Sequence, residues 1–452
     1  MGKWYKKIKK SLFSLNTVIV LSIIALIAVT GSYFYQNTIS NKPEGLLHTL
    51  KHDKYVENAA FSPDSRYIAT TTYGSLLFGL YNVTNSPKLI STLFNLNGVI
   101  KIWDVESGRL IRTFYPDYIQ HSMTNCVEFS PDSKLLAGSS LDGIVRIWDV
   151  DSGKLLHSLK HRPTNTAAPF YNCRLNFSNN GEMLATAVSY QNVRVWDVET
   201  GNLLQTYTHI HSPSGFKQEV YNGIFTNDDK QVITADGNVS AKVWDVKSGE
   251  LLATFSNPVI RKHGSRSYVT LSNNGKLVLL YSDYFSPEIW DLKTGALLHV
   301  LSNDIESLQK IIPNYSSKED IGSWNANFSH NNRFIVNGGF CNIAQVWDVR
   351  SGKLFHTLKH GKIGPAGNRY WVYSAVFSPD DKFILTMSSD GTAKVWETKS
   401  GMLVYIIPDP SPSTSGFKKA EFTNNGKYIF TTSADSKTVR IWKFSPNNYL
   451  SN

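Results

Sequence analysis

A tryptophan-centred phrase recurs at a nearly fixed interval along this chain of 452 residues. Its clearest copy is Arg146-Ile-Trp-Asp-Val-Asp-Ser-Gly-Lys-Leu-Leu-His-Ser-Leu159. The tryptophans of the eight copies are Trp103, Trp148, Trp196, Trp244, Trp290, Trp347, Trp396 and Trp442. Successive copies lie 45, 48, 48, 46, 57, 49 and 46 residues apart. Because such a period is typical of a radial array of repeats, we expect one closed body instead of the roughly three domains that the length alone suggests.

Each repeat is predicted to contain four β-strands. A Phe-Ser-Pro-Asp landmark, clearest at Phe61, Phe129 and Phe377, ends an apolar first strand and begins a tight turn into the second. Looser versions of this landmark begin at Phe177, Phe225, Leu271, Phe328 and Phe422. The tryptophan phrase supplies strands three and four, and the glycine between them provides a positive φ. Eight landmarks and eight tryptophans therefore predict eight four-stranded units.

These motifs resemble the WD-repeat β-propeller family over roughly residues 45–444. The resemblance implies an all-β fold with eight blades, with seven blades as the alternative, and makes the eight tryptophans structural repeat residues. Leu46-Leu-His-Thr-Leu50 matches the fourth strand of other repeats, whereas the last repeat lacks a fourth strand after Trp442. We therefore expect the first strand to complete the last blade, which closes the ring and removes its free sheet edges.

The N-terminus carries a membrane signal. Residues 12–35 follow a basic stretch and contain no ionisable side chain. Roughly 20 apolar residues cross the hydrocarbon core as a helix, and Tyr33 to Tyr35 suit an interfacial aromatic belt. The expected order is a basic cytoplasmic segment (1–11), a transmembrane signal-anchor helix (12–35), a linker (36–44), the propeller on the exported side (45–444) and a tail (445–452).

Two other interpretations of the apolar run are a cleaved secretory signal peptide and a buried core helix. A signal peptide has a shorter apolar region of about 7–15 residues and ends in a small-residue cleavage site. Val29-Thr-Gly-Ser-Tyr33 is a poor match to such a site. We therefore expect a single-pass membrane protein whose N-terminus lies in the cytoplasm.

Charge and cysteine content exclude two classes of site. The net charge is +10, but Lys3, Lys6, Lys7, Lys9 and Lys10 precede every acid, so the rest of the chain is only mildly basic and nucleic-acid binding has little support. The cysteines form no CxxC pair, which argues against a disulfide framework or a zinc site. They are Cys126, Cys173 and Cys341. We interpret all three as buried small residues, with a Cys126–Cys173 bridge between neighbouring inner strands as the alternative in an oxidising compartment.

The resemblance also implies a buried network of histidine, hydroxyl, aspartate and tryptophan in each blade, from which this chain departs. The usual Gly-His dipeptide is missing, and His52, His161 and His360 are its nearest equivalents. Only the seventh repeat offers all four members, which are His360, Ser388 (or Thr386), Asp390 and Trp396. We expect this network to be structural, because it satisfies buried polar groups.

No motif of catalysis was found. The sequence lacks a GxSxG elbow, a GxxxxGK[ST] loop and an HExxH helix. His209 and His211 would share one face of a strand and hold a metal only with further ligands, which the sequence does not place nearby. Eight-bladed quinoprotein dehydrogenases use repeat motifs that are absent here. We therefore expect no metal, no cofactor and no enzyme activity.

The variable parts of the repeats are the connections from each fourth strand to the next first strand. They are long and unlike one another, and the insertion at residues 73–97 is expected on the same face, whereas the turns on the opposite face are short and uniform. A rigid scaffold with variable loops on one face is typical of a binding surface. The candidate binding residues are Phe216, Tyr315, Arg369, Tyr370 and Trp371.

These features predict a membrane-tethered propeller that acts as a protein–protein interaction scaffold. The alternative is a soluble exported propeller that binds glycan or peptide after signal cleavage. The strand at Leu46–Leu50 starts on the face with short turns, so the anchor is expected to join the propeller on that face.

Overall fold

The computed structural model describes the propeller in fifteen ranges. These are residues 45–73, 98–115, 124–140, 143–161, 174–189, 192–209, 220–237, 240–257, 266–283, 285–302, 322–339, 342–361, 371–408, 417–433 and 437–445. From Leu47 onward these residues belong to one compact unit. The predicted signal-anchor, residues 12–35, lies outside the described ranges. Within those ranges, no helix is long and apolar enough to cross a membrane.

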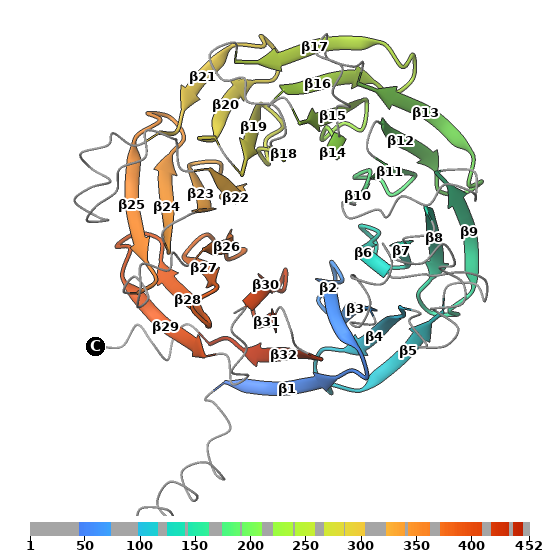
Figure 1. Ribbon diagram of the computed structural model, residues 1–452, viewed down its shortest axis with the longest axis horizontal. Helices are drawn as coiled ribbons and strands as arrows, with labels where there is room; N and C mark the ends of the chain where they lie inside the picture. The colour runs from blue at the N-terminus through green and yellow to red at the C-terminus, as the bar shows by residue number, and fades with distance from the viewer. Residues whose placement is uncertain are drawn as a thin grey trace, which may run out of the picture. The chain divides into compact units, whose positions relative to one another are not determined.

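The described strands form eight four-stranded sheets, which are arranged as blades around a common axis (Figure 1). Blade 1 contains β2 (Tyr55–Phe61), β3 (Tyr67–Tyr73), β4 (Ile100–Asp104) and β5 (Leu110–Phe114). Blade 2 contains β6 (Thr124–Phe129), β7 (Leu135–Ser140), β8 (Ile144–Asp149) and β9 (Leu155–Lys160). Blade 3 contains β10 (Arg174–Phe177), β11 (Met183–Ser189), β12 (Asn192–Asp197) and β13 (Leu203–Thr208). Blade 4 contains β14 (Val220–Phe225), β15 (Gln231–Asp236), β16 (Ser240–Asp245) and β17 (Leu251–Ser256).

The second half of the ring repeats the same order. Blade 5 contains β18 (Ser267–Leu271), β19 (Leu277–Ser282), β20 (Glu288–Asp291) and β21 (Leu297–Val300). Blade 6 contains β22 (Ser323–Phe328), β23 (Phe334–Gly339), β24 (Ile343–Asp348) and β25 (Leu354–Lys359). Blade 7 contains β26 (Val372–Phe377), β27 (Phe383–Ser388), β28 (Thr392–Glu397) and β29 (Leu403–Pro408). Blade 8 contains β30 (Phe417–Phe422), β31 (Tyr428–Ser433), β32 (Thr438–Lys443) and β1 (Leu46–Lys51).

The ring closes as the sequence predicts, because β1 is the fourth strand of blade 8 and lies beside β32. At the end of β1, the N–H of His52 donates to the carbonyl of Lys437, just before β32 begins, at 2.8 Å. The two strands therefore run antiparallel, and β1 starts where β32 ends. Leu50 of β1 is 2% exposed and packs in one cluster with Val56 of blade 1 and Val439 of blade 8. The first strand thus joins both ends of the repeat array in one core.

The core lies between neighbouring blades. The eight tryptophans occupy equivalent positions on the third strands, where all but Trp244 are less than 9% exposed and Trp244 is half-buried. Trp148, for example, packs against Ile100 and Phe114 of the preceding blade. A third strand is covered on both faces by adjacent sheets, which explains why Trp148 on one face of β8 and Val145 and Ile147 on the other are all buried.

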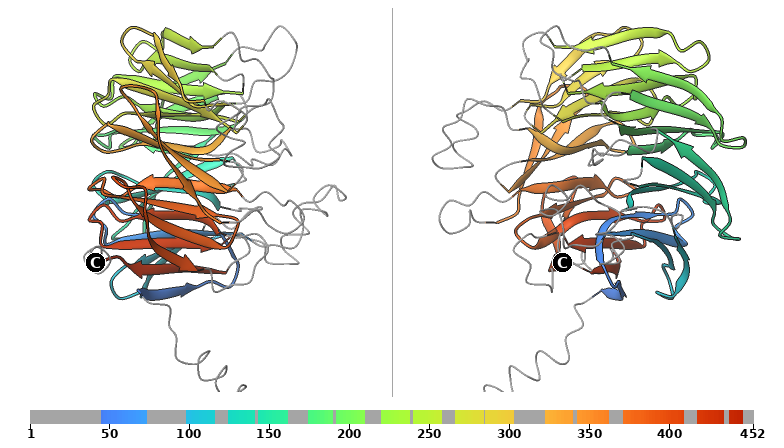
Figure 2. Two further views of the ribbon diagram at one scale, coloured as in Figure 1. Left: turned by 90° about the vertical axis from the view of Figure 1, so that its left-hand side faces the viewer. Right: turned by 45° about the vertical axis from the view of Figure 1, so that its right-hand side comes forward.

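Two short turns in each blade define one face of the ring, which we call the short-turn face (Figure 2). One turn follows the first strand and the other precedes the fourth strand. In the latter turn, Asp149 accepts hydrogen bonds from the backbone N–H and the hydroxyl of Ser152, at 2.7 and 2.5 Å. These bonds hold the pKa of Asp149 below its usual value. The aspartate of the repeated phrase is therefore a turn residue, and we call the opposite face of the ring the loop face.

Side chains of the fourth strands of blades 1, 2, 3, 5, 6 and 8 contact the next blade at this turn. His157 Nε2 contacts the carbonyl oxygen of Glu199 at 3.0 Å, and His48 contacts that of Glu106 at 2.7 Å. Gly201 is required above His157, because its φ is 73° and a Cβ there would lie 2.5 Å from the imidazole. Arg112, Gln205, His299 and His356 make equivalent contacts at other junctions. The recurring histidines of the fourth strands are thus links between blades.

Candidate functional site

The buried tryptophan network is more widespread than the sequence indicated. In blade 7, Thr386 Oγ1 accepts from Trp396 Nε1 at 2.6 Å and lies 2.6 Å from His360 Nε2. Asp390 Oδ2 lies 3.5 Å from His360 Nδ1. The hydroxyl of the network is therefore that of Thr386. The choice of Ser388 was wrong, because β27 turns Ser388 towards Asn342 of the neighbouring blade, whose Oδ1 accepts its hydroxyl proton at 2.6 Å.

Blade 4 contains a second complete network. His209 Nε2 lies 2.8 Å from Thr234 Oγ1, which accepts from Trp244 Nε1 at 2.9 Å. The other ring nitrogen of His209 lies 2.9 Å from Asp236 Oδ2. The expectation that only the seventh repeat has four members was therefore wrong, and His209 is a buried structural residue.

In blades 1 and 3 the described residues form the same network without the aspartate contact. His52 and His161 lie 2.8 and 2.6 Å from the hydroxyls of Thr70 and Thr186, which also accept from Trp103 and Trp196. Burial lowers the pKa of His52 to about 4 and that of His161 to about 3. The two imidazoles are therefore neutral near pH 7, as a network inside an apolar core requires.

The inner strands present two tiers of side chains around the ring axis. We call upper tier the side chains three positions before the last apolar residue of each inner strand. The lower tier consists of the side chains one position before that apolar residue. Many of these side chains bond the edge of the next inner strand; Asn222 Nδ2, for instance, donates to the carbonyl of Val269 at 2.7 Å. Lys419 Nζ similarly donates to the carbonyl of Ala59 at 2.7 Å. These bonds pair backbone groups of an otherwise open sheet edge.

Charged residues of these tiers lie in the sector formed by blades 8, 1, 2 and 3. Lys419 Nζ lies 2.8 Å from Glu421 Oε1. Burial raises the pKa of Glu128 to about 7, and the negative charge of Glu421 adds to this shift while Lys419 and Arg174 oppose it. The small Ala60 of blade 1 separates Glu421 from Glu128 along the lower tier. Glu128 is consequently a carboxyl group that changes charge near neutral pH.

Only one of the five predicted binding residues lies in the described part of the structure. Phe216, Tyr315, Arg369 and Tyr370 lie outside the described residues. Trp371 is described and precedes β26 directly; its ring lies 5.3 Å from that of Trp324 in an edge-to-face arrangement. The ring of Tyr373 lies 6.2 Å from that of Trp324, also in an edge-to-face arrangement. The structure therefore adds two residues that the sequence analysis missed, at the loop-face ends of the inner strands of blades 6 and 7. Their signal was the aromatic residue near the start of both strands.

Cys126 is disulfide-bonded, which corrects its interpretation as a free buried residue. The other two cysteines, Cys173 and Cys341, lie outside the described residues. Among the described residues, no three His, Cys, Asp or Glu side chains are grouped in a way that would hold a metal ion.

The sequence matches the family described as "WD domain, G-beta repeat" at residues 44–78, 108–149 and 352–397. No curated protein matches the chain. Among solved structures, the chain is similar to the computationally designed Ika8 protein, with a TM-score of 0.62 and 18% sequence identity. That match covers 88% of this chain and 100% of the designed chain, and at this identity it concerns the fold alone.

The sequence match at three segments and the ring of eight four-stranded sheets both indicate a β-propeller. WD40 propellers are typical protein-interaction scaffolds and generally lack enzyme activity. The chain is therefore an eight-bladed β-propeller that carries WD40 repeats.

Proposed function

We propose that this propeller is a membrane-tethered, non-enzymatic scaffold that binds other proteins through its loop face. The observation that carries the proposal is the aromatic cluster of Trp324, Trp371 and Tyr373 at that face. Aromatic residues of this kind dominate the binding energy of many interfaces. Arg369 and Tyr370, which directly precede Trp371 in the sequence, belong to the same predicted set of binding residues.

One polar group in this cluster supports a binding role. The indole N–H of Trp324 is buried and has no hydrogen-bond partner within the described part of the chain. An unpaired buried donor costs about 1–3 kcal/mol. A carbonyl or carboxylate supplied by a partner would remove that cost, so the cluster combines apolar area with a directional contact.

The position of β1 supports an orientation relative to the membrane. β1 starts at Leu46 on the short-turn face, and the predicted anchor ends eleven residues earlier, at residue 35, which is at most about 40 Å of extended chain. We propose that the anchor holds the short-turn face towards the membrane, so that the loop face points away from it. The disulfide at Cys126 favours the exported side, where such bonds persist.

Two measurements on the full chain test this function. Protease protection in sealed vesicles should leave residues 1–11 inaccessible from the exported side and the propeller accessible. Proximity labelling and capture of partners should then be lost in a Trp324→Ala, Trp371→Ala double variant and retained in Leu252→Ala, an exposed change near the start of β17 on the short-turn side. Capture that both variants retain would contradict the loop-face assignment.

The second candidate function is a soluble propeller that binds glycan or peptide after signal cleavage. N-terminal sequencing of the mature protein distinguishes the two. A mature chain that begins after residue 35 would exclude the membrane tether. The loop-face binding surface would then be tested by the capture experiment alone.

A further inference from the structure

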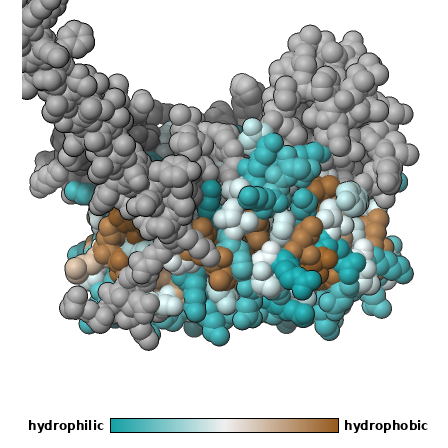
Figure 3. Space-filling model, turned by 90° about the horizontal axis from the view of Figure 1, so that it is seen from below, coloured by the Kyte–Doolittle hydropathy of each residue, from teal (hydrophilic) through white to brown (hydrophobic). Residues whose placement is uncertain are grey.

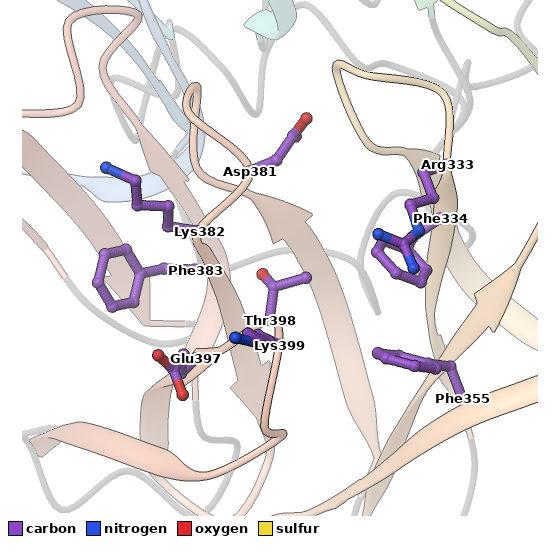
Figure 4. A pocket seen from close by; sticks show the side chains of 9 residues that line it. All are labelled: Arg333, Phe334, Phe355, Asp381, Lys382, Phe383, Glu397, Thr398 and Lys399. Carbon is purple, nitrogen blue, oxygen red and sulfur yellow. The ribbon is translucent and has the colours of Figure 1, made fainter.

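A groove lies between blades 6 and 7 on the short-turn side, at the opposite end of these blades from the aromatic cluster of the loop face. Its volume is about 630 Å³, which lies in the range of ordinary ligand sites. Figure 4 shows its two walls, with Arg333, Phe334 and Phe355 on the blade 6 side facing side chains of blade 7. The blade 7 wall consists of Asp381, Lys382, Phe383, Glu397, Thr398 and Lys399.

The apolar part of the groove is aromatic. The rings of Phe334 and Phe355 are stacked with their centroids 4.7 Å apart. Phe355 is 39% exposed and belongs to the exposed apolar side chains near the starts of the outer strands. Such side chains form brown patches along the rim of the propeller in Figure 3. Stacked rings that remain partly exposed offer a flat apolar wall against which another large side chain can pack.

Thr398 provides the polar contact inside the groove. It is 5% exposed, and its Oγ1 has no hydrogen-bond partner within the described ranges. The corresponding residues of the other seven repeats are all apolar. They are Val105, Val150, Val198, Val246, Leu292, Val349 and Phe444. Since threonine has the shape of valine, the fold does not need this hydroxyl, and an unpaired buried hydroxyl is a cost that a bound acceptor or donor would remove.

The side chains that line the groove include three bases and two acids, so their net charge is positive. Asp381 accepts hydrogen bonds from the backbone N–H groups of His330 and Asn331, at 2.7 and 2.8 Å, and Glu397 accepts from the hydroxyl of Ser400. Both acids are therefore engaged in the turns of the propeller. Arg333 lies 4.8 Å from the ring of Phe334, and Lys399 is exposed beside Thr398. Within the described residues, the ammonium of Lys382 forms an exposed ion pair with Asp380 at 3.4 Å, and such a pair contributes little to stability.

The groove between blades 2 and 3 has the same place in the repeat and the opposite chemistry. It has a volume of about 770 Å³ and presents Leu156 where blade 6 presents Phe355. Its other wall carries Glu182, Asp197 and Glu199, and Glu199 takes the place of Lys399. Val198 stands in the position of Thr398. The architecture of the repeat therefore explains a groove, but it does not explain the aromatic, basic and hydroxyl-bearing lining between blades 6 and 7.

We propose that the groove between blades 6 and 7 docks an acidic peptide segment of a partner protein. An aromatic or large aliphatic side chain of the peptide packs on Phe355 and Phe334, and its flanking carboxylates lie by Arg333 and Lys399. A polar backbone atom of the peptide bonds with Thr398 Oγ1. This contact is on the short-turn side and is separate from the proposed loop-face surface.

Fluorescence anisotropy tests the proposal with the full chain and the labelled peptide Asp-Glu-Phe-Glu-Asp-Leu. We expect saturable binding that weakens at least tenfold in Phe355→Ala and in Lys399→Glu, and several-fold in Thr398→Val. The last variant restores the residue type of the other repeats and keeps the fold. The matched changes Leu156→Ala and Glu199→Lys, in the groove between blades 2 and 3, should leave the affinity unchanged. Near-UV circular dichroism checks that every variant is folded.

Three results would overturn the proposal. The first is equal binding of the basic peptide Lys-Arg-Phe-Arg-Lys-Leu, and the second is affinity that does not change in the Phe355 and Lys399 variants. The third is a different occupant: self-association of the chain in sedimentation, or binding to phosphatidylglycerol vesicles, that is lost in Phe355→Ala while the acidic peptide does not bind.

Discussion

At the residue scale, one threonine hydroxyl joins two strands of its own blade to the end of the preceding blade's outer strand. Thr186 of β11 accepts the indole proton of Trp196 on β12 and contacts His161, which follows the preceding blade's outer strand. Thr70, Thr234 and Thr386 do the same in blades 1, 4 and 7. Because these groups are buried, the network adds stability only when all its members are paired and the histidine is neutral.

This requirement predicts a specific dependence of stability on pH. Burial lowers the pKa of His161 from 6.5 to about 3 in the folded chain, so between these values the unfolded chain binds a proton that the folded chain does not. The free energy of unfolding therefore falls as the pH falls below about 6.5, by about 1.4 kcal/mol for each pH unit and each such histidine. His161→Gln should reduce that slope, as measured by urea denaturation at pH 6.5, 5.5 and 4.5.

The control for this prediction is Leu156→Ala, an exposed change on the same blade that should keep the slope of the original chain. Identical slopes for His161→Gln and the original chain would contradict the assignment. Glu128 acts in the opposite sense, because its pKa is raised to about 7 and the folded chain loses stability as the pH rises from 4.5 to 7. Glu128 is present in all variants, so its contribution cancels in the comparison.

Part of this network was predictable from the sequence, and the rest was not for identifiable reasons. His52, His161 and His360 were found because each follows a lysine at the end of an outer strand. His209 was missed because threonine precedes it, although it too lies six residues after the first leucine of its outer strand. The aspartates differ as well: Asp236 lies two residues after its threonine, whereas Asp390 lies four residues after. Fixed spacing therefore located the histidine and the hydroxyl but did not locate the acid.

At the element scale, β1 determines whether the ring is closed. The match of Leu46–Leu50 to other fourth strands made this pairing predictable, because the pattern of exposed and buried positions repeats in every outer strand. The clasps between blades were not predictable, since His157 and Glu199 are 42 residues apart and their contact depends on the rotation between blades. The groove between blades 6 and 7 depends on the same rotation.

We predict that Leu50→Ala weakens the whole propeller. Leu50 is 2% exposed and joins the core of blade 1 to that of blade 8, so its truncation should cost about 2–5 kcal/mol. Loosening of β1 also uncovers the edge of β32, which promotes association between chains. Leu354→Ala, at the exposed start of another outer strand, should change stability by less than about 0.5 kcal/mol. Guanidinium denaturation and light scattering measure both effects, and equal costs for the two variants would show that β1 does not close the core.

At the scale of the whole molecule, the residues that all eight repeats share build the ring. The residues in which one repeat differs from the others form the proposed binding sites. The eight tryptophans and the short turns form a ring that is nearly uniform. The unusual residues lie at the aromatic cluster of Trp324 and Trp371 and at the groove that contains Thr398, both between blades 6 and 7. The sequence indicated the first through loop composition. It did not indicate the second, because its residues come from four separate strands and turns.

A disulfide adds one covalent link to this closed ring, and the topology predicts its partner. Cys126 lies on β6, the inner strand of blade 2, which packs against β10 of blade 3. Cys173 directly precedes β10, whereas Cys341 lies in the sequence between β23 and β24 of blade 6, four blades away. We therefore expect peptide mapping without reductant to find Cys126 joined to Cys173. Cys341→Ser should retain the linked peptide and Cys173→Ser should remove it.

The same disulfide should also stabilise the fold. A disulfide that closes the loop from Cys126 to Cys173 should add about 2–4 kcal/mol to the free energy of unfolding. Dithiothreitol should therefore lower the denaturation midpoint of the original chain but not that of Cys173→Ser. A Cys126–Cys341 peptide, or a midpoint that dithiothreitol does not change, would contradict the pairing.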